Sequence, residues 1–242
     1  MAAYSGKGAA LYKDSYNLAV QSTAINLAWS CPVEEDTCFQ DDAQTFVAGI
    51  PTWTLGITSN WRDASGSGTD IVYDAALGAS GIYSFYPRGA CPGYGGYGTV
   101  KAIGATYNPN APVRGIITAE VNNQGSGELE HLRCLGASTS TNTSASAALT
   151  SHDYSASATS ASVAGYLHVT TIAGTDPSVT FAVQESADDE TFADLFSFTA
   201  ITAAGEERAT TSSSCARYAR LKYMLNASTT SVSFAAGLHR EE

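Results

Sequence analysis

Apolar and polar residues alternate in the last third of the chain, and this alternation predicts a series of β-strands. Four segments show it most clearly, residues 163–172, 178–184, 217–225 and 231–239. A period of two places every second side chain on the same face of a strand. The side chains expected on the buried faces are Val163, Leu167, Val169, Val179, Phe181, Val183, Ala219, Leu221, Tyr223, Leu225, Val232, Phe234, Ala236 and Leu238. Several short strands with no helical pattern between them predict an antiparallel β-sandwich of about 90 residues.

The first part of the chain also reads as mainly β. Trp53, Leu55 and Ile57 alternate with small or polar residues, and the same pattern recurs at residues 82–85 and 113–121. One helix is expected at residues 69–78, capped by Thr69 or Asp70 and ended by Gly78 in the left-handed conformation. The predicted fold class is therefore mainly β, with an α+β N-terminal domain of packed antiparallel sheets and one flanking helix, followed by the C-terminal sandwich.

Residues 136–162 are dominated by Ser, Thr and Ala. Such a composition is typical of a linker or of the weak edge of a β domain. We place a domain boundary near residue 145, which gives an N-terminal domain of residues 1–145 and a second part of residues 146–242.

Charge narrows the possible functions. Only 14% of the residues are charged, and the formal net charge is −11. Residues 1–145 hold 12 acids and 7 bases (net −5) and residues 146–242 hold 11 and 5 (net −6), so the excess is spread along the chain. An acidic surface repels a phosphate backbone, which argues against nucleic-acid binding. No run of 18 apolar residues and no secretion signal are found, so we expect no membrane anchor and a cytoplasmic start.

The sequence offers only weak signals for catalysis or ligand binding. The segment GYGGYG at residues 93–98 matches the dinucleotide-binding fingerprint, but no strand leads into it and no helix follows, so we interpret it as a flexible Gly/Tyr loop. The acidic run Asp188-Asp189-Glu190 is interpreted as a turn. No catalytic motif occurs, and we expect no enzyme activity, catalytic residue, cofactor or metal.

Two sets of residues remain as candidates for other roles. The acids Glu34, Glu35, Asp36, Asp41 and Asp42 lack the order of a calcium loop and are expected in a solvated loop. The five cysteines form no CxxC pair, and the four histidines lie at no ligand spacing from them. Cys31 and Cys38 could close a disulfide after exposure to oxidants, although unpaired and mostly buried thiols are the favoured interpretation.

The C-terminal pattern resembles a β-sandwich module of tailed-phage structural proteins. The resemblance is carried by residues 183–188 (VQESAD), 192–195 (FADL) and 217–220 (RYAR), and it covers roughly residues 160–240.

The N-terminal part resembles phage major tail proteins over most of residues 5–130. This resemblance is carried by residues 6–12, by Asp36-Thr37, by residues 46–51 before the strand at 53–59, and by residues 85–89 and 112–115. The resemblance implies a virion structural protein, assembled in the host cytoplasm, whose hexameric rings stack into a tail tube. Loops of one ring would contact the next, other tail proteins would bind its ends, and genomic DNA would pass the lumen without specific binding.

A negatively charged lumen suits this role, because a basic one would hold the DNA. The acids at positions 34–42 would either line the lumen or contact a neighbouring ring. The C-terminal domain would project outward, where it could contact a host-surface glycan. Three alternatives remain open: a head decoration protein, a tail-tip protein, and a carbohydrate-binding β-sandwich.

Overall fold

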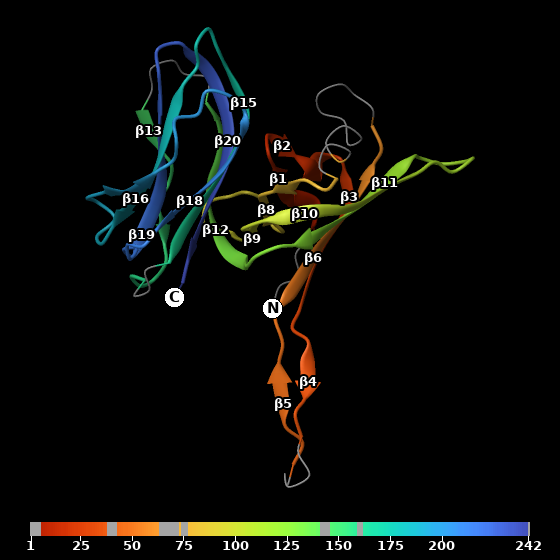
Figure 1. The fold of residues 1–242 in the computed structure, drawn as a ribbon. Coiled ribbons are helices and arrows are strands. Elements are labelled where there is room, and N and C mark those ends of the chain that lie inside the picture. Colours follow the sequence, from red (N-terminus) through yellow and green to blue (C-terminus); the bar gives the residue numbers. More distant parts are fainter. Residues whose placement is uncertain are drawn as a thin grey trace. The chain divides into compact units, whose positions relative to one another are not determined.

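The computed structural model describes residues 6–37, 43–62, 73, 77–140, 146–158 and 162–241. Strands form several antiparallel sheets, which confirms the prediction of a mainly β fold (Figure 1). The predicted helix at 69–78 lies outside the described residues except for Tyr73, which is helical, and residues 77–78. Gly78 does have the expected positive φ, +74°.

The chain groups into two compact units. Unit 1 contains Met1–Val20, Gly81–Lys101 and Gly127–Glu242, and unit 2 contains Gln21–Ser80 and Ala102–Ser126. The boundary near residue 145 stays a prediction about the sequence; in the structure, strands from both sides of it share one sheet.

Unit 1 is built on an eight-stranded sheet that is paired with a smaller one. In spatial order the large sheet contains β18 (Gly205–Thr211), β15 (Val163–Gly174), β20 (Thr229–Arg240), β12 (Leu129–Ser140), β9 (Gly95–Thr99), β8 (Tyr83–Tyr86), β1 (Ala10–Lys13) and β2 (Tyr16–Asn17). The smaller sheet contains β13 (Ser146–Ala148), β19 (Tyr218–Leu225), β16 (Val179–Ser186) and β17 (Ala193–Ser197), with β14 (His152–Asp153) also on β19. Two short 3-10 helices, η1 (Gly6–Gly8) and η2 (Leu18–Val20), flank β1 and β2.

The sandwich core lies between these two sheets. All fourteen side chains that the alternation placed on buried faces belong to this one cluster, so that prediction is confirmed. At its centre the Phe181 ring meets the Phe234 ring edge-on at 4.9 Å between centroids, and the Tyr223 ring lies 5.2 Å from Phe234. Residues 146–153 supply edge strands on β19, as the edge-strand interpretation of that segment predicts.

The other face of the large sheet is also buried, because the sheet curls back on itself. β1 and β15 are separated by five strand-to-strand steps, which would span about 24 Å in a flat sheet. In the structure the two strands are close together, because the Tyr12 ring of β1 stacks on the His168 ring of β15 with 5.8 Å between the ring centroids. A second core fills the enclosed space, with Tyr86, Leu132 and Tyr166 among its members.

A cluster of buried and part-buried polar groups lies where this sheet curls back on itself. We call it the polar seam and define it as Lys13, Asp14, Ser84, His168 and Glu206. The Glu206 carboxylate accepts hydrogen bonds from the Ile82 N–H at 2.8 Å and the Asp14 N–H at 2.7 Å. His168 lies 2.9 Å from the Ser84 hydroxyl through Nε2 and 3.3 Å from the Asp14 carbonyl through Nδ1. A neutral ring with its proton on Nδ1 satisfies both contacts. The seam therefore joins β1, β8, β15 and β18.

Four residues of the GYGGYG segment, Gly95 to Gly98, lie in strand β9, so the interpretation of the segment as a flexible loop was wrong for them, whereas Gly93 lies in a turn with a φ of +80°. β9 pairs with β8 and β12. A Cβ atom on Gly98 would lie 2.7 Å from the Tyr166 ring, and one on Gly96 would lie 2.5 Å from the Tyr86 ring. These glycines are there because large tyrosines of the enclosed core pack directly on the strand backbone.

Unit 2 is a five-stranded antiparallel sheet. In spatial order it contains β3 (Ser22–Ser30), β6 (Thr52–Asn60), β11 (Thr118–Gly125), β10 (Ala102–Asn110) and β7 (Ser80–Gly81). One face buries Trp53, Leu55 and Ile57 of β6, as predicted, with Ala119 and Val121 of β11 beside them.

The strand predicted at 113–121 begins five residues later, at Thr118. Gly115 has a φ of +129°, and Val113 is fully exposed. Pro112 and this left-handed glycine end the alternation, so residues 111–117 form the tip of the β10–β11 hairpin instead.

Gly98→Ala tests the close packing of β9. We expect it to destabilise unit 1 by about 1–3 kcal/mol, because the added methyl group must displace a buried tyrosine ring. Gly95→Ala is the matched control on the same strand, since its Cβ would meet only the Arg133 side chain at an ordinary 3.5 Å. Urea unfolding of both variants measures the difference, and equal stabilities would contradict this packing.

Glu206 gives the seam a pH dependence. Burial raises the pKa of Glu206 from 4.5 to about 7, and the nearby charge of Asp14 adds to this increase. The hydrogen bond from the Ile82 N–H lowers the pKa but does not offset the increase. The folded state then binds this proton more tightly than the unfolded chain, so the stability from this group falls as the pH rises from about 4.5 to 7.

We therefore expect the wild type to lose stability relative to Glu206→Gln over that range, on the order of 2 kcal/mol. His168, whose pKa burial lowers to about 4, acts in the opposite sense but is present in both proteins. Denaturant unfolding at pH 4.5, 6 and 7.5 measures the difference, and a difference that is flat with pH or rises with it would refute the assignment.

Candidate assembly surface

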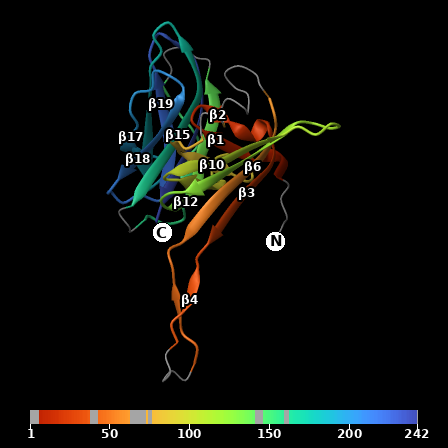
Figure 2. The same ribbon diagram turned by 45° about the vertical axis from the view of Figure 1, so that its right-hand side comes forward.

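A β-hairpin projects from the sheet of unit 2, and we call it the arm. Its strands are β4 (Val33–Glu35) and β5 (Phe46–Ala48), which continue from β3 and β6. Figures 1 and 2 both show it extending away from the five-stranded sheet. Every described residue from 31 to 37 and from 43 to 51 is exposed.

Prolines separate the arm from the sheet. The β3–β6 ladder ends at the pair Ser30 and Thr52, and the arm ladder begins at Val33 and Ala48. Two residues on one strand thus face three on the other, which is the geometry of a β-bulge. Pro32 and Pro51 have no N–H group, so neither can donate a ladder hydrogen bond here.

The arm has its own hydrogen bonds beyond this bulge. The Gly49 N–H donates to the Pro32 carbonyl at 2.7 Å, and the Asp36 N–H donates to the Thr45 carbonyl at 2.9 Å. The Thr45 hydroxyl donates back to the Asp36 carbonyl at 2.9 Å. These bonds hold the two strands of the arm together. The outer edge of each strand pairs with no other strand that the structure describes.

Apolar side chains on the arm are exposed to solvent. The exposed fractions are 61% for Val33, 59% for Phe46, 53% for Val47 and 83% for Ile50. An isolated two-stranded hairpin is marginally stable, and apolar groups gathered on a projecting element mark an interaction site. The arm is therefore a candidate surface for binding another chain.

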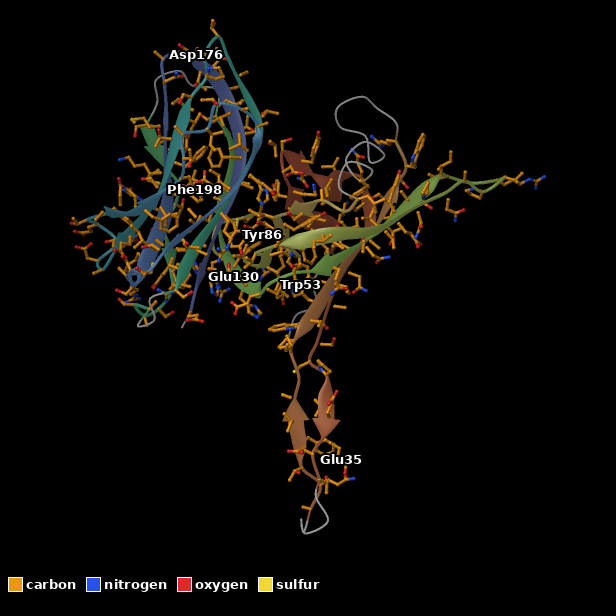
Figure 3. All side chains as sticks on the ribbon, in the orientation of Figure 1. Glu35, Trp53, Tyr86, Glu130, Asp176 and Phe198 are labelled. Atoms are coloured by element: carbon orange, nitrogen blue, oxygen red, sulfur yellow. The ribbon has the colours of Figure 1, made fainter. Side chains whose placement is uncertain are left out.

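Acidic and apolar side chains share each face of the arm. Glu35 lies directly opposite Phe46, with Val33 and Ala48 on the same face, whereas Glu34 lies opposite Val47 on the other face. Figure 3 shows Glu35 on the arm, well away from Trp53 at the start of β6. Each face thus combines a carboxylate with a hydrophobic side chain.

The structure places three of the five predicted acidic residues on this arm, namely Glu34, Glu35 and Asp36. Asp41 and Asp42 lie outside the described residues, as does Cys38. Cys31 is a free, exposed thiol at the base of the arm, with its Sγ 3.2 Å from the Gly49 carbonyl. The pairing of Cys31 with Cys38 stays a prediction.

The second acidic run is a turn, as predicted. Asp188 Oδ1 accepts hydrogen bonds from the Ser186 hydroxyl and from the N–H groups of Glu190 and Thr191, at 2.7 to 3.0 Å. These bonds lower the pKa of Asp188 to about 2, and Asp189 adopts a φ of +63°. Among the described residues no group of His, Cys, Asp and Glu is arranged to hold a metal ion.

Sequence reasoning found the acids of the arm but missed its exposed apolar residues. Residues 46–51 are identified from the sequence only as the segment before the strand at 53–59, with no prediction of their exposure. The available signal was the spacing of the prolines, because Pro32 and Pro51 bracket two short apolar segments that the main sheet cannot include.

None of the helices that the structure describes has the length and apolar character needed to cross a lipid bilayer. No protein-family model and no curated protein matches the sequence.

Solved structures give distant similarities. A chain of the virion of a native gene transfer agent (GTA) particle is 12% identical, with a TM-score of 0.45, over 53% of this chain and 98% of that one. A chain of the tail of an empty GTA particle with C6 symmetry is 14% identical, with a TM-score of 0.40, over 52% and 97%. The SPP1 Dit protein, described as a paradigm of the hub adsorption apparatus in phages that infect Gram-positive bacteria, is 12% identical, with a TM-score of 0.37, over 96% and 98%. All these TM-scores lie below 0.5, so we base the function on the geometry of the chain itself.

The exposure of the arm predicts that its apolar residues do not stabilise the fold. We expect Phe46→Ser to change the free energy of unfolding by less than about 0.5 kcal/mol, because Phe46 is exposed and is not part of a hydrophobic core. Leu55→Ala, on the buried face of the sheet and 1% exposed, should cost about 2–5 kcal/mol. Urea unfolding of the dilute protein compares the two, and a large loss for Phe46→Ser would show that the arm packs on its own chain.

Proposed function

We propose that this chain is a phage-type tail tube subunit that associates with copies of itself into stacked rings. The observation that carries the proposal is the arm, a projecting hairpin with exposed apolar side chains and two open strand edges. A two-stranded hairpin is marginally stable in water, and an exposed strand edge is a template for pairing with another chain. A structural protein that assembles through β-rich surfaces is the simplest function that uses it.

The ring and its contents come from the resemblance of the sequence to major tail proteins. That resemblance implies six subunits in each ring and a lumen through which DNA passes. The net charge of −11 supports such a conduit, because an acidic wall does not retain a phosphate backbone. A repeated contact between two different patches closes into a ring when its rotation permits.

The arm favours inter-subunit contact as the role of Glu34, Glu35 and Asp36, over lining of the lumen. Acids beside exposed Phe46 and Val47 suit a surface where apolar groups supply affinity and charges choose the partner. Head decoration and tail-tip placement are outcomes that the experiment distinguishes.

The test is electron microscopy of the concentrated protein, together with mass spectrometry of heads and tails separated from the particle. We expect hexameric rings or tubes, and many copies along the tail. A protein that stays monomeric at high concentration, or that is found only on heads or at the tip, would refute the proposal.

Removal of the apolar arm side chains should weaken assembly. We expect the double variant Phe46→Ser, Val47→Ser to lose roughly 3 kcal/mol of association free energy, about a hundredfold in affinity. Met224→Ser is the control, since Met224 is as exposed, at 53%, but lies on β19. Sedimentation velocity measures the shift, and equal behaviour of the two variants would contradict the role of the arm.

A further inference from the structure

Unit 1 contains a groove of about 680 Å³, a volume in the range of ligand sites. β9, β12 and β20 form it together with the segment after β8. Its lining includes Pro87, Arg133, Tyr154, Leu238 and Arg240.

Two arginines of the groove have no acidic partner. In this unit Arg208 pairs with Glu130, and Arg217 pairs with Asp153. Arg133 and Arg240 form no ion pair with any carboxylate that the structure describes. Both line the groove of a chain that has only 12 basic residues and a net charge of −11.

Arg240 is the more unusual of the two, because it is 93% buried by its relative exposure of 7%. It donates hydrogen bonds to the carbonyls of Ala216, at 3.1 Å, and Ala156, at 2.7 Å, and it lies 4.1 Å from the centroid of the Tyr154 ring. Its Nε and the Tyr154 hydroxyl have no hydrogen-bond partner among the described atoms. Neutral partners leave the positive charge of Arg240 uncompensated, which is costly for a buried ion.

The positive charges of the two arginines affect the pKa of a neighbouring histidine. Burial first, and then the Arg133 charge, lower the pKa of His152, with a further contribution from Arg240 and an opposing one from Asp153. Arg88, His131 and His239 also line the groove, and Glu241 is the acid among them. Pro87, Leu132 and Leu238 supply apolar surface between these polar groups.

The arm has the complementary chemistry. One of its faces carries Glu35 between Val33 and Phe46, a carboxylate flanked by exposed apolar side chains. A guanidinium binds a carboxylate through two parallel hydrogen bonds, and this pairing gives strong orientation. We propose that the groove of one copy binds the Glu35 face of the arm of a second copy. This inference rests on the proposed function and names the partner surface for the arm.

A charge exchange tests the contact. Arg133→Glu and Glu35→Arg are both substitutions of exposed residues, and each should weaken association about tenfold or more. Lys101→Glu, also exposed, is the control for the added negative charge. Glu120→Arg is the control for the added positive charge, because it makes the same change at an exposed position on β11, outside the arm. Both controls should retain most of the association, and thermal unfolding should show that all variants fold.

Mixing the variants identifies the second copy. In an equimolar mixture of Arg133→Glu chains and Glu35→Arg chains, each arm meets a groove of opposite charge, so we expect association to recover. Recovery only when both substitutions are in one chain would place the arm in the groove of its own chain and overturn the proposal. A small acidic molecule found in the groove by native mass spectrometry, with Arg133→Glu assembling normally, would also overturn it.

The outcomes separate the two proposals. If the wild type assembles and Arg133→Glu assembles equally well, the groove contact is wrong and the tail tube proposal stands. If the wild type does not assemble at all, the tail tube proposal fails and the groove contact fails with it.

Discussion

Closure of the large sheet in unit 1 brings polar groups from distant parts of the sheet together, in positions where they satisfy one another's hydrogen bonds. β1 and β15 are five strand-to-strand steps apart, and the polar seam links the two ends of the curled sheet through Glu206, Asp14 and His168. Glu206 and His168 have hydrogen-bond partners far away in the sequence, so removing either one leaves a buried or part-buried group without a partner, a larger loss than the net value of one bond. The sandwich core on one face and the tyrosine core on the other both rely on this curvature.

The glycines of β9 follow from the same closure. Once the sheet curls, Tyr86 and Tyr166 lie inside it, and the strand beneath them must be flat. Gly96 and Gly98 provide that flat surface. A segment that resembles a nucleotide-binding loop by its letters is thus explained by packing, because the space available to a Cβ atom, and not a ligand, selects glycine there.

The sequence predicted the sandwich core well and the assembly surface only in part. Alternation identified fourteen side chains of β15, β16, β19 and β20 that form the sandwich core, since a period of two is a local property, but it did not show that the opposite face of β15, with Ala164, Tyr166 and His168, is buried too. It could not show that Val113 lies at a hairpin tip, or that Phe46 belongs to a projecting element, because exposure depends on which strands pair. The polar seam and the groove were also missed: His168 and Glu206 are 38 residues apart, and Arg133 and Arg240 come from strands whose pairing is not local.

The acids of the arm have one more consequence. Two bare hairpins with open edges would pair with each other and grow into amyloid-like stacks. In an edge-to-edge pairing of identical β4 strands, Glu34 and Glu35 of one copy approach the same carboxylates of the other, and that repulsion opposes the stack. In the proposed contact, the same side chains that would bind the basic groove would therefore also oppose pairing of two free arms.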